Sequence, residues 1–379
     1  MGRIFPFRVK HFLLLLSLLI VLAGIGWWQR TPLLAWYYVR GLSGAENEDR
    51  ETWVTRVVGL DSAAVPALLA CLRRDNPQAC GNVQAALVHL VAHWGSSDPR
   101  TQELAEKVTE SFPGLSGSGQ QSALALVIEF FRGQTPAAGP PTLAIAAERM
   151  LTAAAQAKEP GVQARALALA EVIMEAATLS SCRDSLRGLV SAGLKNPDAE
   201  TRIRAVHLTL HETFREDNAL RAQVAPLLHD SETSVRRAAV LGVGMAEQIV
   251  TEDELLPLLH DADAEVRRLC EGALRGRGLR DDHLKLARLI SDARPSARLE
   301  VVDYLLEASD LEPGAWLRRL SQDPSPAVRA AAVRAAAAQT RVDLSERLRD
   351  VAQSDSSPTV RQLAGHYYQQ HRQALALRP

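Results

Sequence analysis

The chain has 379 residues, of which 47% are hydrophobic and 23% charged, and its formal net charge at pH 7 is −1. A chain this close to neutrality has no global basic field for nucleic acid, and no basic region is interleaved with aromatic residues. We therefore expect no nucleic acid among its partners. The length would suit two ordinary domains, unless the chain is built of repeats that stack in one dimension.

The first pronounced feature is an apolar run from Phe12 to Trp28, which contains only one polar residue, Ser17. A helix of this length spans about 26 Å, close to the hydrocarbon thickness of a bilayer. The run therefore predicts a transmembrane helix over residues 12–28. No A-x-A site follows it, which favours an uncleaved signal anchor over a cleaved signal peptide. A buried core helix is a third interpretation.

Basic residues flank this run unequally. Three occupy the first ten positions, whereas Arg30 and Arg40 follow the run and are soon joined by acidic residues. Because cytoplasmic flanks carry the excess of Lys and Arg, we expect residues 1–11 in the cytoplasm and the remainder outside. In a bacterial cell this describes a single-pass protein of the inner (plasma) membrane with a periplasmic domain. Aromatic residues typical of an interfacial belt close the run and follow it: Trp27, Trp28, Trp36, Tyr37 and Tyr38.

The C-terminal half repeats one pattern, in which an Asp precedes an Arg by six residues. The six arginines are 32, 31, 31, 31 and 32 residues apart. A fixed period of this size indicates a stacked array of one supersecondary unit. The pairs are Asp198 and Arg204, Asp230 and Arg236, Asp261 and Arg267, Asp292 and Arg298, Asp323 and Arg329, and Asp355 and Arg361.

Each unit consists of a short apolar segment, a turn led by the Asp, and an Ala-rich segment such as residues 330–336. Both segments have helical rather than alternating spacing. About 31 residues leave room for two short helices and two turns, and none for a strand. The sequence therefore predicts an all-α fold, an α-solenoid of stacked helix-turn-helix repeats preceded by one transmembrane helix.

The pattern D-x4-V-R followed by alanines resembles the HEAT repeat, and its length is similar to that of the short, phycobilin-lyase-like HEAT subclass. In that family the Asp and Arg lie at the turn and at the start of the inner helix, and they form a ladder of hydrogen bonds between repeats. The resemblance implies this structural role for the twelve residues above. It covers residues 185–372 and departs at Ala297, where Val is usual, and at His207, where other copies have small residues or Val.

The rest of the chain divides by composition. Residues 29–50 are predicted to be a polar juxtamembrane linker, residues 51–160 degenerate helical repeats, and residues 161–379 the HEAT-type array. The degenerate copies keep the apolar helical segments and lose the Arg, which Gln84 replaces in one of them. Terminal repeats are expected to be atypical because they cap an array.

Four cysteines occur, at positions 71, 80, 182 and 270. Disulfides are allowed in an exported domain, and Cys71 and Cys80 flank one predicted turn, so we predict that these two can form a disulfide. Cys182 and Cys270 lie several repeats apart and should not pair. The cysteines lack the C-x-x-C spacing of a zinc site.

No constellation for catalysis or cofactor binding is evident. Two histidine pairs, His89 with His93 and His207 with His211, share a helix face but lack a third metal ligand. No nucleophile elbow and no paired-carboxylate motif occur. We therefore expect no enzyme, no cofactor, no metal and no small-molecule substrate.

HEAT arrays are mostly scaffolds and binding surfaces, so the resemblance implies a scaffold that binds a protein or peptide, and the predicted transmembrane helix would anchor it in the membrane. We expect the partner on the concave face, which the second helix of each repeat lines. Helical phase predicts that its exposed positions include Arg237, Arg268, Glu300, Asp303 and Arg334. Two alternatives stay open: a bilin-lyase-like HEAT enzyme, and a cytoplasm-facing scaffold of a signalling or motility complex.

Overall fold

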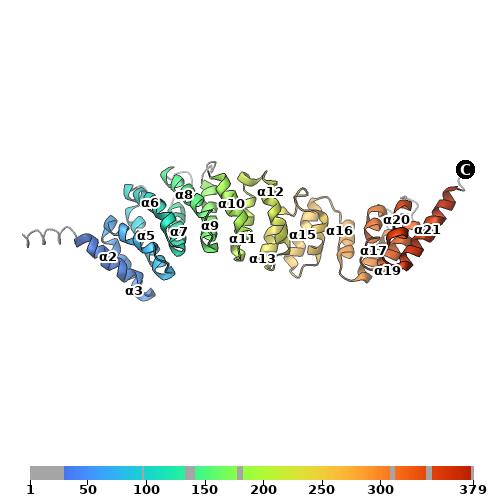
Figure 1. Ribbon diagram of the computed structural model, residues 1–379, viewed down its shortest axis with the longest axis horizontal. Helices are drawn as coiled ribbons and strands as arrows, with labels where there is room; N and C mark the ends of the chain where they lie inside the picture. Colours follow the sequence, from blue (N-terminus) through green and yellow to red (C-terminus); the bar gives the residue numbers. More distant parts are fainter. Residues whose placement is uncertain are drawn as a thin grey trace, which may run out of the picture. The chain divides into compact units, whose positions relative to one another are not determined.

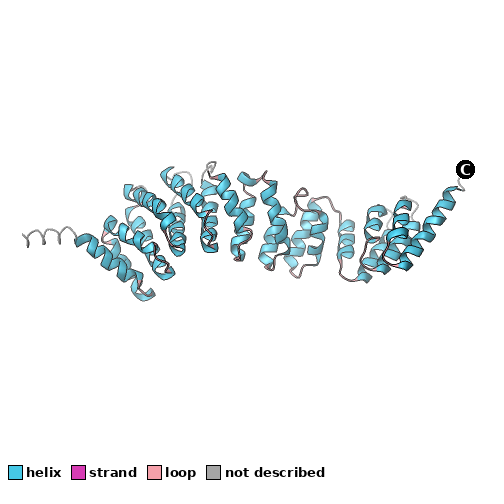
Figure 2. Cartoon of the chain, in the orientation of Figure 1, coloured by secondary structure: helices cyan, strands magenta, loops and turns pink. Residues whose placement is uncertain are grey.

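The computed structural model describes residues 30–95, 98–132, 141–176, 182–307, 312–338 and 344–376. Every regular element in these ranges is a helix (Figure 2), so the predicted all-α fold is confirmed for the part of the chain described. The helices group into two compact units, Met1–Leu220 and Arg221–Pro379. This division lies well beyond residue 160, where the sequence predicted a change from degenerate to regular repeats.

The first unit begins with a long run of α-helices joined by short turns (Figure 1). Its helices are α2 (Arg30–Ser43), α3 (Asn47–Val58), η1 (Asp61–Ala64), α4 (Val65–Leu72), α5 (Pro77–Trp94), α6 (Pro99–Ser111), η2 (Phe112–Gly114), α7 (Gly117–Arg132), α8 (Pro141–Ala154), α9 (Pro160–Ala176), α10 (Arg183–Gly193), α11 (Ala199–Thr209) and η3 (Glu212–Phe214), with α12 (Asn218–Arg221) at the division.

The second unit alternates short and long helices (Figure 1). They are η4 (Ala222–His229), α13 (Thr233–Val243), α14 (Glu252–Leu255), η5 (Leu256–His260), α15 (Ala264–Gly276), α16 (Asp281–Ser291), α17 (Pro295–Glu307), α18 (Pro313–Leu320), α19 (Pro326–Ala338), α20 (Ser345–Ser354) and α21 (Pro358–Ala376). We call α13, α15, α17, α19 and α21 the inner helices, because each follows an Asp-led turn of the repeat.

Each unit is built of two helical layers. In the first, α3, α5, α7, α9 and α11 contact one another in sequence, and α2, α4, α6, α8 and α10 form the second layer. In the second unit α13 contacts α15, and α17, α19 and α21 contact one another in order. Contacts restricted to near neighbours are the signature of a solenoid, whose stability is a sum of repeat and interface terms.

The core of the second unit explains the repeat pattern. The residue before each ladder arginine is buried, and this holds for Val235, Val266, Val328 and Val360. Ala297, where the pattern departs from Val, is buried as well. The spacing that recurs in each repeat therefore places one small or β-branched side chain near the start of every inner helix. There the side chain packs into the core.

The turns supply their own helix caps. Asn76 accepts a hydrogen bond from the Ala79 backbone N–H at 3.0 Å, and Asp263 accepts one from Val266 N–H at 2.9 Å. Such caps satisfy one of the N–H groups left unpaired at a helix start. Because these groups are satisfied locally, α5 begins at the residue that follows Asn76 and α15 at the residue that follows Asp263.

The predicted linker over residues 29–50 is wrong for the part that the structure describes, because α2 and the start of α3 occupy it. Ala35, Val39 and Leu42 are buried at a helical spacing that the sequence already contained. The side-chain amide of Asn82 donates to the backbone oxygen of Leu42 at 2.9 Å. The first repeat therefore begins with α2.

The predicted transmembrane segment, residues 12–28, lies outside the described residues. Within the described ranges no single helix is long and apolar enough to cross a bilayer, and only α3 taken together with Asp61–Leu72, at a bend of 117°, meets that test of length and composition.

Candidate binding surface and the ladder beside it

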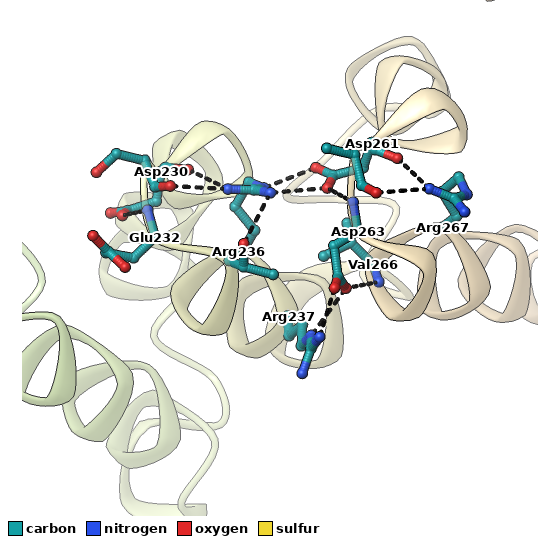
Figure 3. Close-up of polar contacts among 11 residues, drawn as sticks. Asp230, Glu232, Arg236, Arg237, Asp261, Asp263, Val266 and Arg267 are labelled. Carbon is teal, nitrogen blue, oxygen red and sulfur yellow. Dashed lines mark hydrogen bonds and ion pairs between the residues drawn. The ribbon is translucent and has the colours of Figure 1, made fainter.

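Three ladder arginines of the second unit, Arg236, Arg298 and Arg329, each tie two neighbouring turns together. The Nη1 of Arg236 donates to the backbone oxygens of Asp230 at 2.9 Å and Ser231 at 3.1 Å, in its own turn. Its Nε and Nη2 donate to the two carboxylate oxygens of Asp261, both at 2.8 Å, in the next turn (Figure 3). This bidentate, charge-assisted geometry is the strongest arrangement available to an Arg and a carboxylate.

The same aspartate also shapes its own turn. The carboxylate of Asp261 accepts a hydrogen bond from the Asp263 N–H at 2.8 Å while it binds Arg236 (Figure 3). Hydrogen bonds from Arg236 lower the pKa of Asp261 below its ordinary value, and burial opposes this effect. The carboxylate therefore stays ionised at neutral pH, as the ladder requires.

Two further rungs have this geometry. Arg298 donates to Asp323 at 2.6 and 2.9 Å, and Arg329 donates to Asp355 at 2.8 and 2.8 Å. All four side chains are less than a tenth exposed. Removing one partner of a buried ion pair leaves an unpaired charge, which costs on the order of 3 kcal/mol. These side chains are buried and paired with one another, so they are not available to a ligand.

One rung of the predicted ladder is missing. Arg267 donates to the backbone oxygens of Asp261 and Ala262, but it has no bond to Asp292. The Asp292 carboxylate binds Arg294 of its own turn instead, at 3.1 and 2.9 Å. The junction between α15 and α17 therefore lacks the cross-repeat ion pair that joins the other inner helices. Arg361, in the last copy, donates to the Asp355 backbone oxygen at 2.5 Å.

The predicted pair Asp198 and Arg204 is out of register, and the equivalent residues are Asn196 and Arg202. Arg202 donates to the backbone oxygens of Asn196 and Pro197, both at 2.8 Å, as the other ladder arginines do in their own turns. The Asn196 side chain accepts from the Asp198 N–H at 3.0 Å, the role that Asp plays elsewhere.

Asp198 and Arg204 have other tasks. Asp198 caps α11 by accepting from the Thr201 N–H at 2.9 Å, and Arg204 pairs with Glu171 of α9 at 3.0 Å. The corrected register also explains the anomaly at His207, because the buried Ala205 now occupies the position of Ala239. The sequence missed this copy because Asn replaces the Asp that defined the pattern.

The residues predicted to bind a partner lie in two different settings. Arg237 donates to Asp263 at 3.0 and 2.6 Å, and Arg268 donates to Glu265 at 2.8 and 2.5 Å. Hydrogen bonds from Arg237 and from the Val266 N–H lower the pKa of Asp263 to about 2. Arg237 and Arg268 are therefore already engaged by carboxylates on the surface.

Asp303, Arg334 and Glu300 are exposed. Asp303 and Arg334 form no hydrogen bond or ion pair with any residue that the structure describes. Both occupy the fifth position after a ladder arginine, and that position is exposed in every inner helix. We call these five positions the exposed row: Leu241, Gly272, Asp303, Arg334 and His366.

The exposed row begins with an apolar patch that the sequence analysis did not single out. Leu241 lies near the end of α13 and Met245 lies two residues beyond that end, and each is 64% exposed. The corresponding positions of α15, 31 residues later, are Gly272 and Gly276. A Cβ atom at Gly272 would meet no atom within 4 Å, and one at Gly276 would lie 2.5 Å from the Cε of Met245. Gly276 therefore lies directly against the Met245 side chain, whereas Gly272 has no neighbouring side chain within that distance.

The four cysteines all lie in described residues and are buried free thiols. The predicted disulfide between Cys71 and Cys80 is therefore absent from this structure. The Sγ of Cys80 is directed to the Arg74 backbone oxygen at 3.6 Å and to the Ser118 hydroxyl at 3.4 Å. Burial, and then the nearby Cys80, raise the pKa of Cys71, so its thiol is poorly reactive. Among the described residues no cluster of three metal-ligating side chains occurs.

Residues 284–368 match the family model of HEAT repeats. The repeats of α16 to α21 are therefore of the HEAT type, as the sequence pattern indicated. Among solved structures, importin beta is similar with a TM-score of 0.53 and 13% identity, over 88% of this chain and 52% of the importin chain. This chain thus spans about half of that protein, and the likeness concerns the fold of stacked HEAT repeats.

Two other solved structures are similar at lower scores. An engineered protein matches with a TM-score of 0.40 and 16% identity, over 89% of this chain and 95% of that one. A structure of tubulin recruitment and assembly by microtubule polymerases with TOG domain arrays matches with a TM-score of 0.27 and 11% identity, over 84% and 87%. Neither score supports an argument about fold. No curated protein matches the sequence.

Proposed function

We propose that this protein is a HEAT-repeat scaffold that binds a protein or peptide through the exposed row of its inner helices. The observation that carries the proposal is the exposure of Leu241 and Met245, which are each 64% exposed. A fold that needed only to bury its core would gain from covering these side chains. Clustered apolar side chains with a polar rim are typical of interaction sites.

The ladder supports this assignment by elimination. Arg236, Arg298 and Arg329 are bound on both sides by backbone oxygens and carboxylates. The ladder therefore accounts for the strongest sequence signal without any ligand. The residues of the exposed row take no part in the ladder and are exposed.

The row also suggests the chemistry of the partner. The apolar patch of Leu241 and Met245 is followed along the row by Asp303 and then by Arg334, which are unpaired among the described residues. A peptide with an aliphatic side chain at one end, and a basic and an acidic group further along, would match this order. The proposal assigns binding and no catalytic step to the chain.

We further propose that the scaffold is held at a membrane by residues 12–28, with the helical array on the periplasmic side. The apolar run and the excess of basic residues before it support this location. A reporter fused at the C-terminus that is active on only one side of the membrane tests it. An active extracytoplasmic reporter is expected, and a cytoplasmic C-terminus would contradict the orientation.

Photo-crosslinking tests the binding surface itself. p-Benzoylphenylalanine replaces Leu241 or Asp303 in the full chain within its own membrane, and Gln353 of α20, which is exposed, provides the matched control. The two row positions are expected to give an adduct of the same partner, which position 353 does not give. Equal adducts from all three positions, or none from the row, would refute this surface.

A further inference from the structure

The helix α2 has two unlike faces. Ala35, Val39 and Leu42 are buried against the first repeat. On the other side Leu33, Trp36 and Tyr37 are 59%, 54% and 56% exposed. No other described helix exposes three large apolar or aromatic side chains. This face has no partner within the described part of the chain beyond ring contacts at its edge.

The helix is held firmly in this orientation. The Asn82 amide donates to the backbone oxygens of Leu42 and Ala45, at 2.9 and 3.0 Å. A Cβ at Gly41 would lie 2.6 Å from the ring of Trp53, so α2 and α3 approach closely. The Tyr37 ring also meets the Trp53 ring edge-on, at 6.2 Å between centroids. The exposed face is therefore presented by a fixed element and not by a loose tail.

The position of this face in the chain indicates what covers it. The apolar run ends at Trp28, and α2 begins at Arg30. Two residues reach at most about 7 Å, and the helical rise from Arg30 to Trp36 adds about 9 Å. If the run spans a bilayer, Trp36 must lie within about 16 Å of its end.

The side chains of this face suit the interfacial layer of a bilayer. Trp and Tyr combine an apolar ring with one polar group, and both are enriched at the level of the lipid headgroups. The guanidinium carbon of Arg40 lies 5.4 Å from the centroid of the Trp36 ring. A long basic side chain in this place can cover the ring and still reach lipid phosphates.

We propose that Leu33, Trp36 and Tyr37 lie in the interfacial layer of the bilayer that residues 12–28 enter. The inference rests on the membrane anchor of the proposed function and adds a second contact to it. Because α2 packs against α3, α4 and α5, docking of its exposed face orients the first repeats against the membrane. A flexible tether would leave their orientation undefined.

The depth of a spin label measures this contact directly. Trp36→Cys is made in the full chain, labelled with a nitroxide, and reconstituted in nanodiscs of zwitterionic and anionic phospholipid. The native cysteines are buried, so the label is directed to position 36. Ile145→Cys is the matched control, because Ile145 is an apolar residue of α8 that is 51% exposed. Leu33→Cys repeats the measurement in case the first variant folds poorly.

Collisions with oxygen, which partitions into lipid, are compared with collisions with a water-soluble nickel chelate. The proposal predicts that oxygen dominates at positions 36 and 33 and that the nickel chelate dominates at position 145. Failure of the chain to enter nanodiscs would refute both the anchor and the docking. Entry with position 36 as exposed to nickel as position 145 would refute the docking alone. Protection from both reagents would indicate that a protein, such as a second copy of the chain, covers the face. That outcome would also refute docking to the bilayer.

Discussion

Arg298 and Asp323 belong to consecutive repeats, yet the Arg298 Nε lies 2.6 Å from the Asp323 Oδ2 and both side chains are less than a tenth exposed. Arg298 also donates to the backbone oxygens of Asp292 and Ala293, at 2.7 and 2.9 Å. One side chain therefore closes its own turn and binds the next. A rung of this kind couples neighbouring repeats through a buried ion pair in addition to their apolar contacts.

The next rung gives a direct prediction, since α19 carries both a ladder arginine and an exposed one. Arg329→Ala removes a buried pairing with Asp355 and is expected to lower the free energy of unfolding by about 3 kcal/mol. Arg334→Ala, on the exposed row of the same helix, is expected to change it by less than about 0.5 kcal/mol. Urea unfolding of both variants tests this. Similar losses in the two variants would count against a structural ladder.

Because one rung is missing, the ladder arginines are expected to contribute unequally to the free energy of unfolding. Arg267 keeps only its bonds to the backbone oxygens of Asp261 and Ala262. Its replacement by Ala is expected to cost about 1–1.5 kcal/mol, which is less than the cost of Arg298→Ala. Urea midpoints of the two variants, measured side by side, provide the comparison. An Arg267→Ala variant as unstable as Arg298→Ala would mean that Arg267 does bind Asp292 in solution.

The ladder also predicts acid sensitivity. Hydrogen bonds from Arg236 and Arg329 lower the pKa values of Asp261 and Asp355. A carboxyl group whose pKa is lower in the folded state contributes stability above its unfolded pKa, about 3.9. That stability is lost as the pH falls through the folded pKa. The stability that these two groups contribute should therefore be constant above about pH 5 and should decrease as the pH falls below about 4.

Thermal melting as a function of pH checks this. Asp355→Asn cannot titrate, so its melting temperature is expected to fall less steeply below about pH 4 than that of the wild type. Asp303→Asn, which changes an exposed carboxylate outside the ladder, should follow the wild-type slope. Identical slopes in the wild type and Asp355→Asn would exclude this carboxyl from the acid response.

Replacement of Gly272 is expected to raise the stability of the protein, in contrast to the arginine substitutions. It lies inside α15, and a Cβ there would meet no atom within 4 Å. Because glycine is a poor helix former, Gly272→Ala is expected to stabilise the protein by about 0.5–1 kcal/mol. Gly276→Ala should gain less, since its Cβ would push against Met245. Thermal melts of the two variants distinguish them, and a destabilised Gly272→Ala would show that the position is covered.

The repeating architecture could be predicted because the period of about 31 residues is written in the sequence, and the buried valines follow from it. The sequence pattern did not reveal the copy at Asn196 and Arg202, because there the amide oxygen of Asn196 replaces the Asp carboxylate that accepts the hydrogen bond within the turn. The helical status of α2 was detectable in the spacing of Ala35, Val39 and Leu42. The polar residues that follow it concealed this spacing.

The candidate site was harder to predict than the fold. Charged residues at helical phase suggested Arg237 and Arg268. The engagement of Arg237 by Asp263 depends on which turn lies beside it, whereas Arg268 pairs with Glu265 three residues earlier in α15, a contact that helical spacing allows. The hydrophobic periodicity of the sequence would assign Leu241 and Met245 to the core. Their exposure becomes evident only in the folded array, where the side chains that surround them are placed.

The most direct test of the account is the affinity of the crosslinked partner for the full chain carrying Leu241→Asp and Met245→Asp. Gln353→Asp serves as the control for added charge on an exposed helix. We expect the double variant to melt like the wild type and to bind at least about tenfold more weakly, as hot-spot side chains do. An unchanged affinity in a folded double variant would contradict the claim that the exposed row binds the partner.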